Sequence, residues 1–185
     1  MVKEILSDTK TRMDKSIDSL RHELVKIRTG KATTALLDTV KVDYYGSMTD
    51  LRQLANVSVL DAHTLSVQPW DKGSLEAIEK GIMSADLGLN PMNDGNLIRV
   101  PIPQLTEERR KELVKLIKKF GEESKVAIRN IRRDANEQLK KSEKEEHLSE
   151  DDRINGEKKV QELTDDHSKR IDDIVADKEK ELMEV

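Results

Sequence analysis

The sequence predicts an α+β protein: a long antiparallel three-helix bundle with a small β/α/β domain inserted between its first two helices. Two observations lead to this prediction. Three long segments repeat apolar residues at helical spacing, and the stretch between the first two holds short alternating runs broken by glycine and proline. The composition agrees, because 38% of the 185 residues are charged and only 2% are aromatic. Such a chain suits long solvated helices.

The first predicted helix covers residues 5–27. Its apolar residues follow a seven-residue repeat and are Leu6, Met13, Ile17, Leu20, Leu24 and Ile27. Because this repeat keeps one stripe of the helix apolar along its whole length, we expect the helix to pack lengthwise against partner helices. Gly30 is the expected stop, since glycine readily ends a helix.

The second predicted helix covers residues 106–145. Thr106 is a suitable N-cap, and the acids Glu107 and Glu108 suit the positive end of the helix dipole. The expected buried face consists of Leu113, Leu116, Ile117, Phe120, Ala127, Ile131 and Ala135. Gly121 lies inside this helix, where it should cost about 1 kcal/mol relative to alanine. Close packing or a slight bend is the only role that the sequence offers for it.

The third predicted helix covers residues 150–183. Ser149 and Asp152 resemble a capping box at its start. The expected buried face consists of Ile154, Val160, Leu163, Ile171, Ile174, Val175 and Leu182. Helices this charged do not stay ordered alone, so three apolar faces in one chain indicate a bundle within a monomer. The bundle is assigned residues 1–30 and 105–185.

Residues 31–104 form the predicted inserted domain. The expected strands lie at 40–44, 57–59, 65–67 and 97–100, with a helix at 74–87 that ends before Gly88 and a turn at 93–96. Two short linkers join this domain to the bundle and should lie side by side as a hinge. The expected hinge residues are Thr29, Gly30, Lys31 and Ala32 in the first linker, and Ile102, Pro103, Gln104 and Leu105 in the second.

Catalytic and metal-binding chemistry leaves no clear pattern in the sequence. There is no cysteine, which excludes disulfides and thiolate sites. The four histidines lack the spacing of a helical zinc site, and His167 falls on the buried face of the third helix, where a structural role is expected. Lys31 follows Gly30, but the rest of a phosphate-binding loop is missing. We therefore expect no cofactor, no metal and no enzymatic activity.

The sequence also bears on location. It shows no signal peptide, no transit peptide and no run long enough to span a membrane. A cytoplasmic protein without a membrane partner is expected.

A stripe of basic residues on the second helix is the strongest candidate site. Residues 105–145 hold 13 basic and nine acidic residues, a net charge of +4, against −7 for residues 146–185. On a helical wheel, seven cations fall within roughly 100° of arc. They are Lys111, Lys115, Lys118, Lys125, Arg129, Arg132 and Arg133. An ordinary charged face, tied by pairs such as Arg133 with Glu137, is the alternative interpretation.

Arginine content and aromatic content together favour a structured nucleic acid as the partner. Three arginines lie within five residues, and the planar guanidinium fork matches phosphate. Only Trp70, Tyr44, Tyr45 and Phe120 are aromatic, too few for stacking single-stranded bases. We expect recognition of phosphate and shape, as in folded RNA. A chaperone-like helical protein and an enzyme of unknown type remain the alternatives.

At these same residues the sequence resembles the ribosome recycling factor family over its whole length. The most specific matching stretches are residues 28–30, 35–38, 44–46, 84–91, 98–103, 105–110 and 126–135. The chain departs from the family pattern at Lys31, where arginine is usual, at Thr33 and Thr34, and in the loop at residues 48–50.

The resemblance implies a function and a shape. It implies an L-shaped molecule of tRNA-like size whose bundle binds large-subunit ribosomal RNA in the post-termination ribosome. It further implies that elongation factor G acts on the small domain, and that GTP hydrolysis on that factor drives the subunits apart and releases the mRNA. Residue by residue, it assigns RNA contact to Arg28, Arg129, Arg132 and Arg133, and a basic pair of less defined role to Arg109 and Arg110. Lys125 joins this set because it lies on the same stripe.

Overall fold

The structure is a computed structural model that describes residues 1–145 and 147–184. The chain divides into two compact units: Met1–Arg28 together with Glu107–Val185, and Thr29–Thr106. The first unit is all helical and the second holds every strand of the described residues. This agrees with the predicted α+β class, in which long helices flank a small β-containing insertion.

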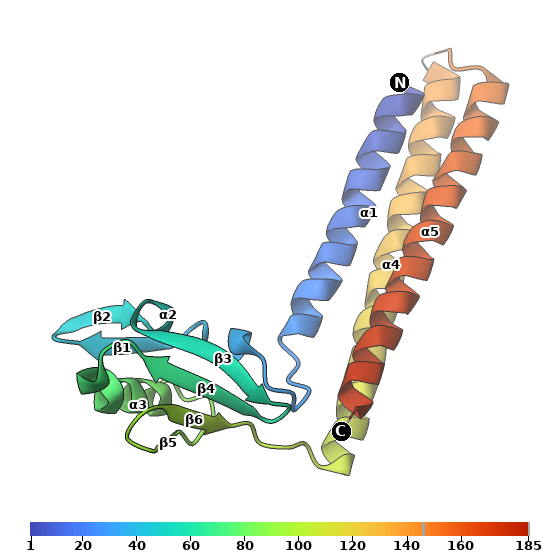
Figure 1. Cartoon of the computed structure of the whole chain (residues 1–185). Coiled ribbons are helices and arrows are strands. Elements are labelled where there is room, and N and C mark those ends of the chain that lie inside the picture. The colour runs from blue at the N-terminus through green and yellow to red at the C-terminus, as the bar shows by residue number, and fades with distance from the viewer. Residues whose placement is uncertain (146, 185) are drawn as a thin grey trace. The chain divides into compact units, whose positions relative to one another are not determined.

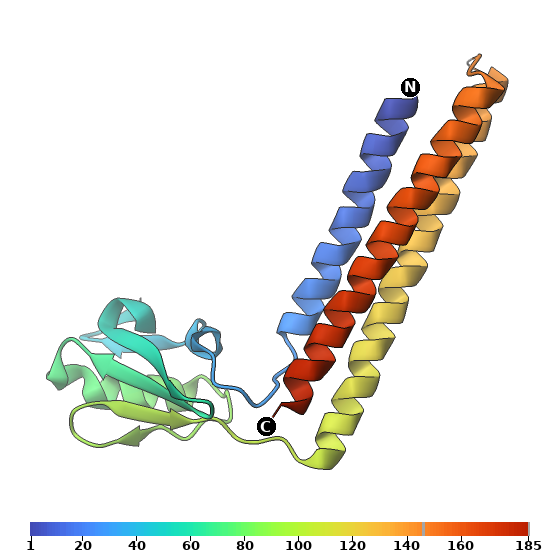
Figure 2. The ribbon, with the colours of Figure 1, turned by 45° about the vertical axis from the view of Figure 1, so that its right-hand side comes forward.

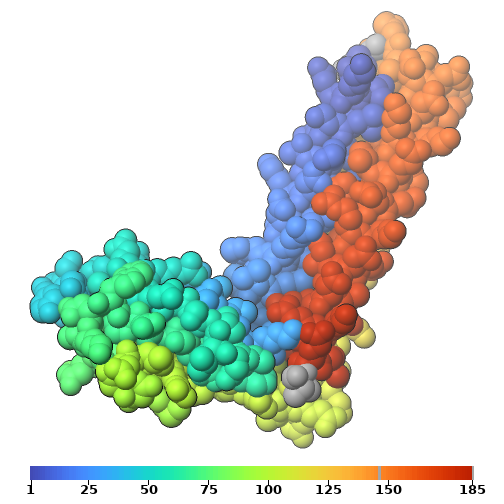
Figure 3. All heavy atoms as spheres, in the orientation of Figure 1, coloured from blue at the N-terminus to red at the C-terminus, as the bar shows by residue number. Residues whose placement is uncertain are grey.

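The helical unit is a three-helix bundle of α1 (Val2–Val25), α4 (Glu107–Glu145) and α5 (Glu150–Met183). All three helices contact one another. α1 and α5 run in the same direction, and α4 runs antiparallel to both (Figures 1 and 2). The side chains of α1 and α5 meet along the length of the bundle (Figure 3). Ser149 caps α5 by accepting a hydrogen bond from the Asp152 backbone N–H at 3.1 Å, as the sequence predicts.

The core of the bundle follows the predicted apolar stripes, but not every residue expected inside is fully buried. Those only partly buried include Leu116, Phe120, Ala127, Leu163, Ile174 and Val175. Leu6 is only partly buried, and Ile154 is 47% exposed although it was expected inside. Gly156, two residues later, takes the inward position instead, and a Cβ there would lie 3.0 Å from Leu139 Cδ2. The apolar spacing alone misses this because glycine carries no hydrophobic signal.

Gly121 has a similar explanation. A Cβ on Gly121 would lie 2.6 Å from Val175 Cγ2, closer than real Cβ contacts allow. Gly121 is therefore the residue that lets α5 approach α4 closely at this level. Close packing, rather than a bend, accounts for its place inside α4.

The second unit holds two antiparallel sheets and two helices, one of them a single turn. The strands β1 (Lys41–Tyr44) and β2 (Ser47–Asp50) form a hairpin, and a four-stranded sheet has the order β3-β4-β6-β5. Its strands are β3 (Ala55–Asp61), β4 (Thr64–Pro69), β5 (Met92–Asn93) and β6 (Ile98–Pro101), and the helices are α2 (Leu51–Leu54) and α3 (Leu75–Ser84), with 3-10 turns at Thr34–Leu37 and Lys72–Ser74. The short α2, β2 and β5 were not predicted, because they lack the alternation of apolar and polar residues that marks β1 and β6.

Two predicted helix ends lie too far along the chain. α1 ends at Val25, where the Ile27 N–H bonds the Leu24 carbonyl in a tighter turn, and Gly30, with φ of +80°, lies in the linker. α3 ends at Ser84 rather than at residue 87. The left-handed φ of Asp86, +52°, ends it ahead of Gly88. In both helices glycine marks the loop and not the last turn.

The two linkers lie side by side and are tied to the same turn, between β3 and β4. The Ala32 N–H bonds the Ala62 carbonyl at 2.9 Å, and the Ile102 N–H bonds the His63 carbonyl at 2.7 Å. His63 Nδ1 also donates to the Gly30 carbonyl, 3.3 Å away. Ala32 and Ile102 are buried with the apolar core of this unit. The inner half of each linker is thus fixed to the small unit.

Candidate nucleic-acid interface

The basic stripe of α4 is set by the residues that α4 buries. Ile128 and Ile131 face the bundle core, and Ala135 and Leu139 continue the same face. Arg129, Arg132 and Arg133 therefore project away from the core, where Arg129 and Arg133 are exposed and Arg132 is half-buried. The helix brings together four of the sequence-predicted residues here, since Lys125 lies one turn before Arg129.

Two of these four cations are partly neutralised by acids. Arg129 pairs with Glu122 on the same helix, Nη2 to Oε1 at 3.0 Å. Lys125 reaches across to Asp172 of α5 and is the less exposed partner of that pair. Exposed ion pairs of this kind contribute about 1 kcal/mol or less, so a phosphate group can replace the acid at small cost.

Arg132 and Arg133 are the two arginines of the stripe that have no acidic partner among the described residues. Arg132 Nη1 is 3.4 Å from Gln161 Oε1 of α5, a neutral partner. Among residues 1–145 and 147–184, Arg133 has no ion pair or side-chain hydrogen bond, so the pair with Glu137 that the alternative interpretation offered as an example does not form. An ordinary charged face stays the alternative interpretation, and other cations of the stripe do form such pairs, as Arg129 does with Glu122 and Lys111 with Glu107.

The basic pair Arg109 and Arg110 lies at the other end of α4, in its first turn. Twenty residues separate Arg109 from Arg129, which corresponds to about 30 Å along a helix. Arg109 pairs with Glu112 at 2.9 Å, whereas Arg110 Nε is buried without a hydrogen-bond partner among the described residues. Cations oppose the positive end of the helix dipole, so helix stability does not explain two arginines here. Arg28, also exposed, follows the end of α1.

Some residues at this surface were missed from the sequence alone. A helical wheel of α4 contains no residue of another helix, so it could not show the α5 residues Asp172 and Gln161 beside the stripe. Val126 is an apolar residue beside the stripe and is 43% exposed. The only sequence signal for Val126 is that it falls outside the apolar spacing of α4.

Other chemistry is not indicated by the geometry. Within the described part of the chain, no three His, Asp or Glu side chains are grouped to hold a metal ion. None of the described helices combines the length and the apolar character needed to cross a membrane. The stripe on α4 thus stays the main candidate site.

Comparison with known proteins identifies the family. A sequence model described as Ribosome recycling factor matches residues 20–183, most of the chain. The chain belongs to the ribosome recycling factor family. The resemblance stated from the sequence motifs is thereby confirmed.

Curated relatives match the chain from end to end. The chain is 57% identical over 185 residues to a ribosome-recycling factor of Syntrophomonas wolfei, with 100% of both chains covered. It is 55% identical over 184 residues to that of Ralstonia pickettii, covering 100% of this chain and 99% of the relative. The whole chain, and not one unit of it, therefore carries the family likeness.

Solved structures agree. A solution structure of the ribosome recycling factor matches with a TM-score of 0.75 at 40% identity, covering 100% of this chain and 98% of the other. A second match, with a TM-score of 0.63 at 47% identity and complete coverage of both chains, is the Thermus thermophilus ribosome recycling factor. In that structure the factor and Escherichia coli elongation factor G are bound to the E. coli post-termination complex.

Proposed function

We propose that this protein binds the post-termination ribosome and, with elongation factor G and GTP, promotes its dissociation into subunits and its release from mRNA. Its own contribution is binding and mechanical, without catalysis, and it works as a monomer in the cytoplasm, where ribosomes are found. The observation that carries the RNA-binding part is the pair Arg132 and Arg133, two cations held outward without an acidic partner in the described part of the chain. The family membership supports the ribosome as the target.

The chemistry of the stripe fits ribosomal RNA of the large subunit. Guanidinium groups can bind phosphate oxygens through two parallel hydrogen bonds. The helix spaces such groups along one line, as a continuous phosphate backbone requires. Arg129 and Lys125 can join when their acids are displaced, and Arg28, Arg109 and Arg110 add charge nearer the linkers.

The double variant Arg132→Ala, Arg133→Ala tests this assignment. We expect weaker ribosome binding in sucrose gradients and a salt dependence whose slope falls by about one unit for each phosphate that the variant no longer binds. Thermal stability should change by less than about 0.5 kcal/mol, because neither side chain supports the core. A matched control is Arg21→Ala with Lys169→Ala, which removes two exposed cations from α1 and α5. Unchanged binding by the stripe variant, or equal weakening in the control, would reject the assignment.

The inserted unit is proposed to act as a lever for elongation factor G. Residues 31–104 carry a net charge of −3 and hold no arginine cluster. Ribosome binding is therefore assigned to the bundle, and the force from elongation factor G to the inserted unit. Because Gly30, Ala32 and Ile102 are bonded to the β3–β4 turn, bending should be confined to the outermost linker residues, Thr29 in the first linker and Pro103 to Leu105 in the second.

Deleting residues 31–104 and bridging the ends with a short Gly/Ser loop tests the lever. The bundle should fold, bind ribosomes and compete with the full protein, yet fail to split ribosomes with elongation factor G. Normal splitting by this variant would reject the lever. A folded variant that does not bind would instead place the affinity in the inserted unit.

A further inference from the structure

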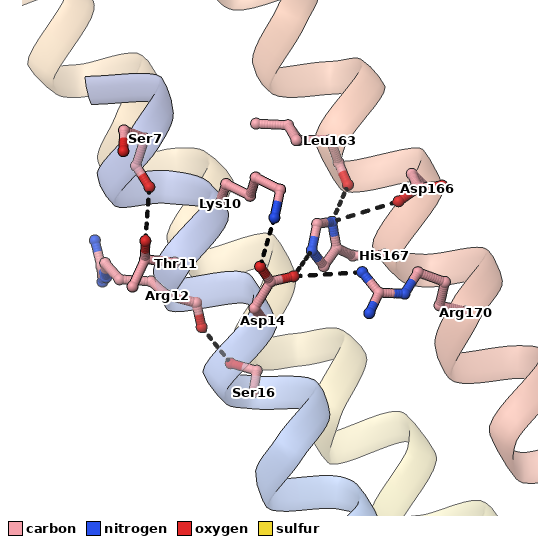
Figure 4. A network of polar contacts seen from close by, with 10 residues as sticks. All are labelled: Ser7, Lys10, Thr11, Arg12, Asp14, Ser16, Leu163, Asp166, His167 and Arg170. Carbon is pink, nitrogen blue, oxygen red and sulfur yellow. Dashed lines mark hydrogen bonds and ion pairs between the residues drawn. The ribbon is translucent and has the colours of Figure 1, made fainter. Parts of the chain in front are cut away.

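A histidine is completely buried between α1 and α5 of the bundle. His167 on α5 is 0% exposed, and its two ring nitrogens face two different oxygens (Figure 4). Nδ1 lies 2.7 Å from the backbone carbonyl oxygen of Leu163, one turn earlier on α5. Nε2 lies 2.8 Å from Oδ1 of Asp14 on α1. No solvent or substrate reaches the ring, so a catalytic role is excluded by its burial.

Both oxygens can only accept hydrogen bonds. A backbone carbonyl has no proton, and the carboxyl of Asp14 is ionised, because hydrogen bonds from Lys10 and then from His167 hold its pKa well below the usual range. A neutral imidazole carries one N–H, so one of its nitrogens would present a lone pair to an oxygen at hydrogen-bond distance. Only the doubly protonated ring donates to both.

The charged groups around the ring come from each helix packed there. On α1, Lys10 Nζ and Asp14 Oδ2 are 2.8 Å apart. On α5, Arg170 Nη1 is 3.3 Å from Asp14 Oδ1, and an oxygen of Asp166 is 4.0 Å from His167 Nδ1. On α4, Asp134 pairs with Arg12 of α1 at 2.8 Å, and no described ionisable side chain of α4 pairs with His167.

We propose that His167 is held in the folded protein as a buried imidazolium. Its second proton then allows the ring to donate hydrogen bonds to Asp14 and Leu163 at once, which stabilises the packing of α5 against α1. With this proton the ring donates across the helix pair to Asp14 and along its own helix to Leu163. Without it, one of the two hydrogen bonds becomes a repulsion between lone pairs, and Asp14 loses a cationic partner. The bundle therefore contains a proton-dependent clasp.

Nitrogen-15 NMR of the imidazole rings in the full-length protein tests this directly. At pH 7 we expect both ring nitrogens of His167 to give protonated shifts, while His22 and His147, which are exposed, serve as internal references. In Asp14→Asn the side-chain amide can donate to Nε2, so the ring should carry a single proton at the same pH. One protonated and one unprotonated nitrogen in the wild type at pH 7 would overturn the proposal.

Stability against pH gives a second readout. An unfolded histidine loses its proton near pH 6.5, so above this pH unfolding should release the proton that the folded clasp retains. The unfolding equilibrium constant should then rise with pH by up to roughly tenfold per pH unit from this group. His167→Gln should lose that increment, and the exposed control His147→Gln should keep it. Equal slopes for His167→Gln and wild type would contradict the clasp.

Discussion

The two units are held together in different ways. The inserted unit encloses one continuous core of fifteen buried apolar residues drawn from both sheets, α3 and the linkers. Both units also bury polar side chains, Thr29, Ser66 and Ser74 in the inserted unit and Thr9, Ser124, Ser142, Thr164 and His167 in the bundle. Both contain a closely packed glycine, Gly81 against the Lys41 carbonyl in the inserted unit and Gly121 and Gly156 between α4 and α5. The difference is that the bundle, among the described residues, also buries an ionisable side chain, His167, whose contacts with Asp14 join α5 to α1.

The largest expected effect is on the apolar core of the inserted unit. Ile78 of α3 is 0% exposed, and Ile78→Ala should destabilise this unit by about 2–5 kcal/mol through lost transfer energy and a cavity. Amide hydrogen exchange should show reduced protection in β4 and β6 and unchanged protection in α5. The matched change Ile128→Ala in α4 should reduce amide protection in α5 and leave protection in β4 and β6 unchanged. Equal reduction in both units for either variant would mean that the two cores are not independent.

A smaller effect is expected where the bundle depends on close approach. Gly121→Ala should destabilise the bundle by about 1 kcal/mol, because an overpacking cost of about 1–3 kcal/mol exceeds the helix-propensity gain of about 1 kcal/mol. Chemical denaturation followed by helical circular dichroism would measure it. Adding Val175→Ala should relieve the clash, so the double variant should exceed Gly121→Ala in stability. A double variant no more stable than Gly121→Ala would show that Val175 is not the obstacle.

The cap of α5 should matter to a similar or slightly lower degree. Ser149→Ala removes the acceptor for the Asp152 N–H and should cost about 1 kcal/mol. Ser149→Asp, which restores an acceptor, is the matched control and should recover most of the loss. Thermal unfolding of the full-length chain would detect both changes, and an unaltered midpoint for Ser149→Ala would show that the cap is dispensable.

The smallest expected effect is on acid stability. The pKa of Asp14 is lowered in the folded bundle, so its stabilisation is present above the unfolded value, about 3.9, and is lost as pH falls toward the folded value. Denaturation at pH 5 and pH 3 should show a larger loss for wild type than for Asp14→Asn. The exposed Asp18→Asn is the control and should follow wild type. Identical losses in wild type and Asp14→Asn would show that Asp14 gains nothing from its partners.

Most of the helical architecture could be predicted because periodicity over more than twenty residues is a strong signal. The starts of α4 and α5 fell within one residue of the prediction. The inward Gly156 and the exposed Ile154 could not be predicted, because hydrophobic spacing does not register a glycine that faces a neighbouring helix. The short β2, β5 and α2 depend on tertiary contacts and leave almost no local pattern.

The candidate site was predicted in its residues but not in its electrostatics. A wheel for a single helix places Arg129, Arg132 and Arg133 on one arc, and α4 presents them that way. It cannot show that Asp172 of α5 neutralises Lys125, or that Arg133 is left without an acid among the described residues. His167 was expected to be structural from its place on the apolar stripe, yet its partner Asp14 lies 153 residues away in the chain and could not be inferred.

The direction of the helices also determines where a reporter can be attached. Since α1 and α5 run the same way, the first residue of α1 and the last turn of α5 lie at opposite ends of a bundle about 50 Å long, given 34 residues in α5. A fluorophore or affinity handle fused before Met1 would project from the end remote from both linkers. The same handle placed after α5 would lie at the end of the bundle from which the linkers leave. Immobilisation on a surface through the amino terminus would therefore leave the linkers unobstructed.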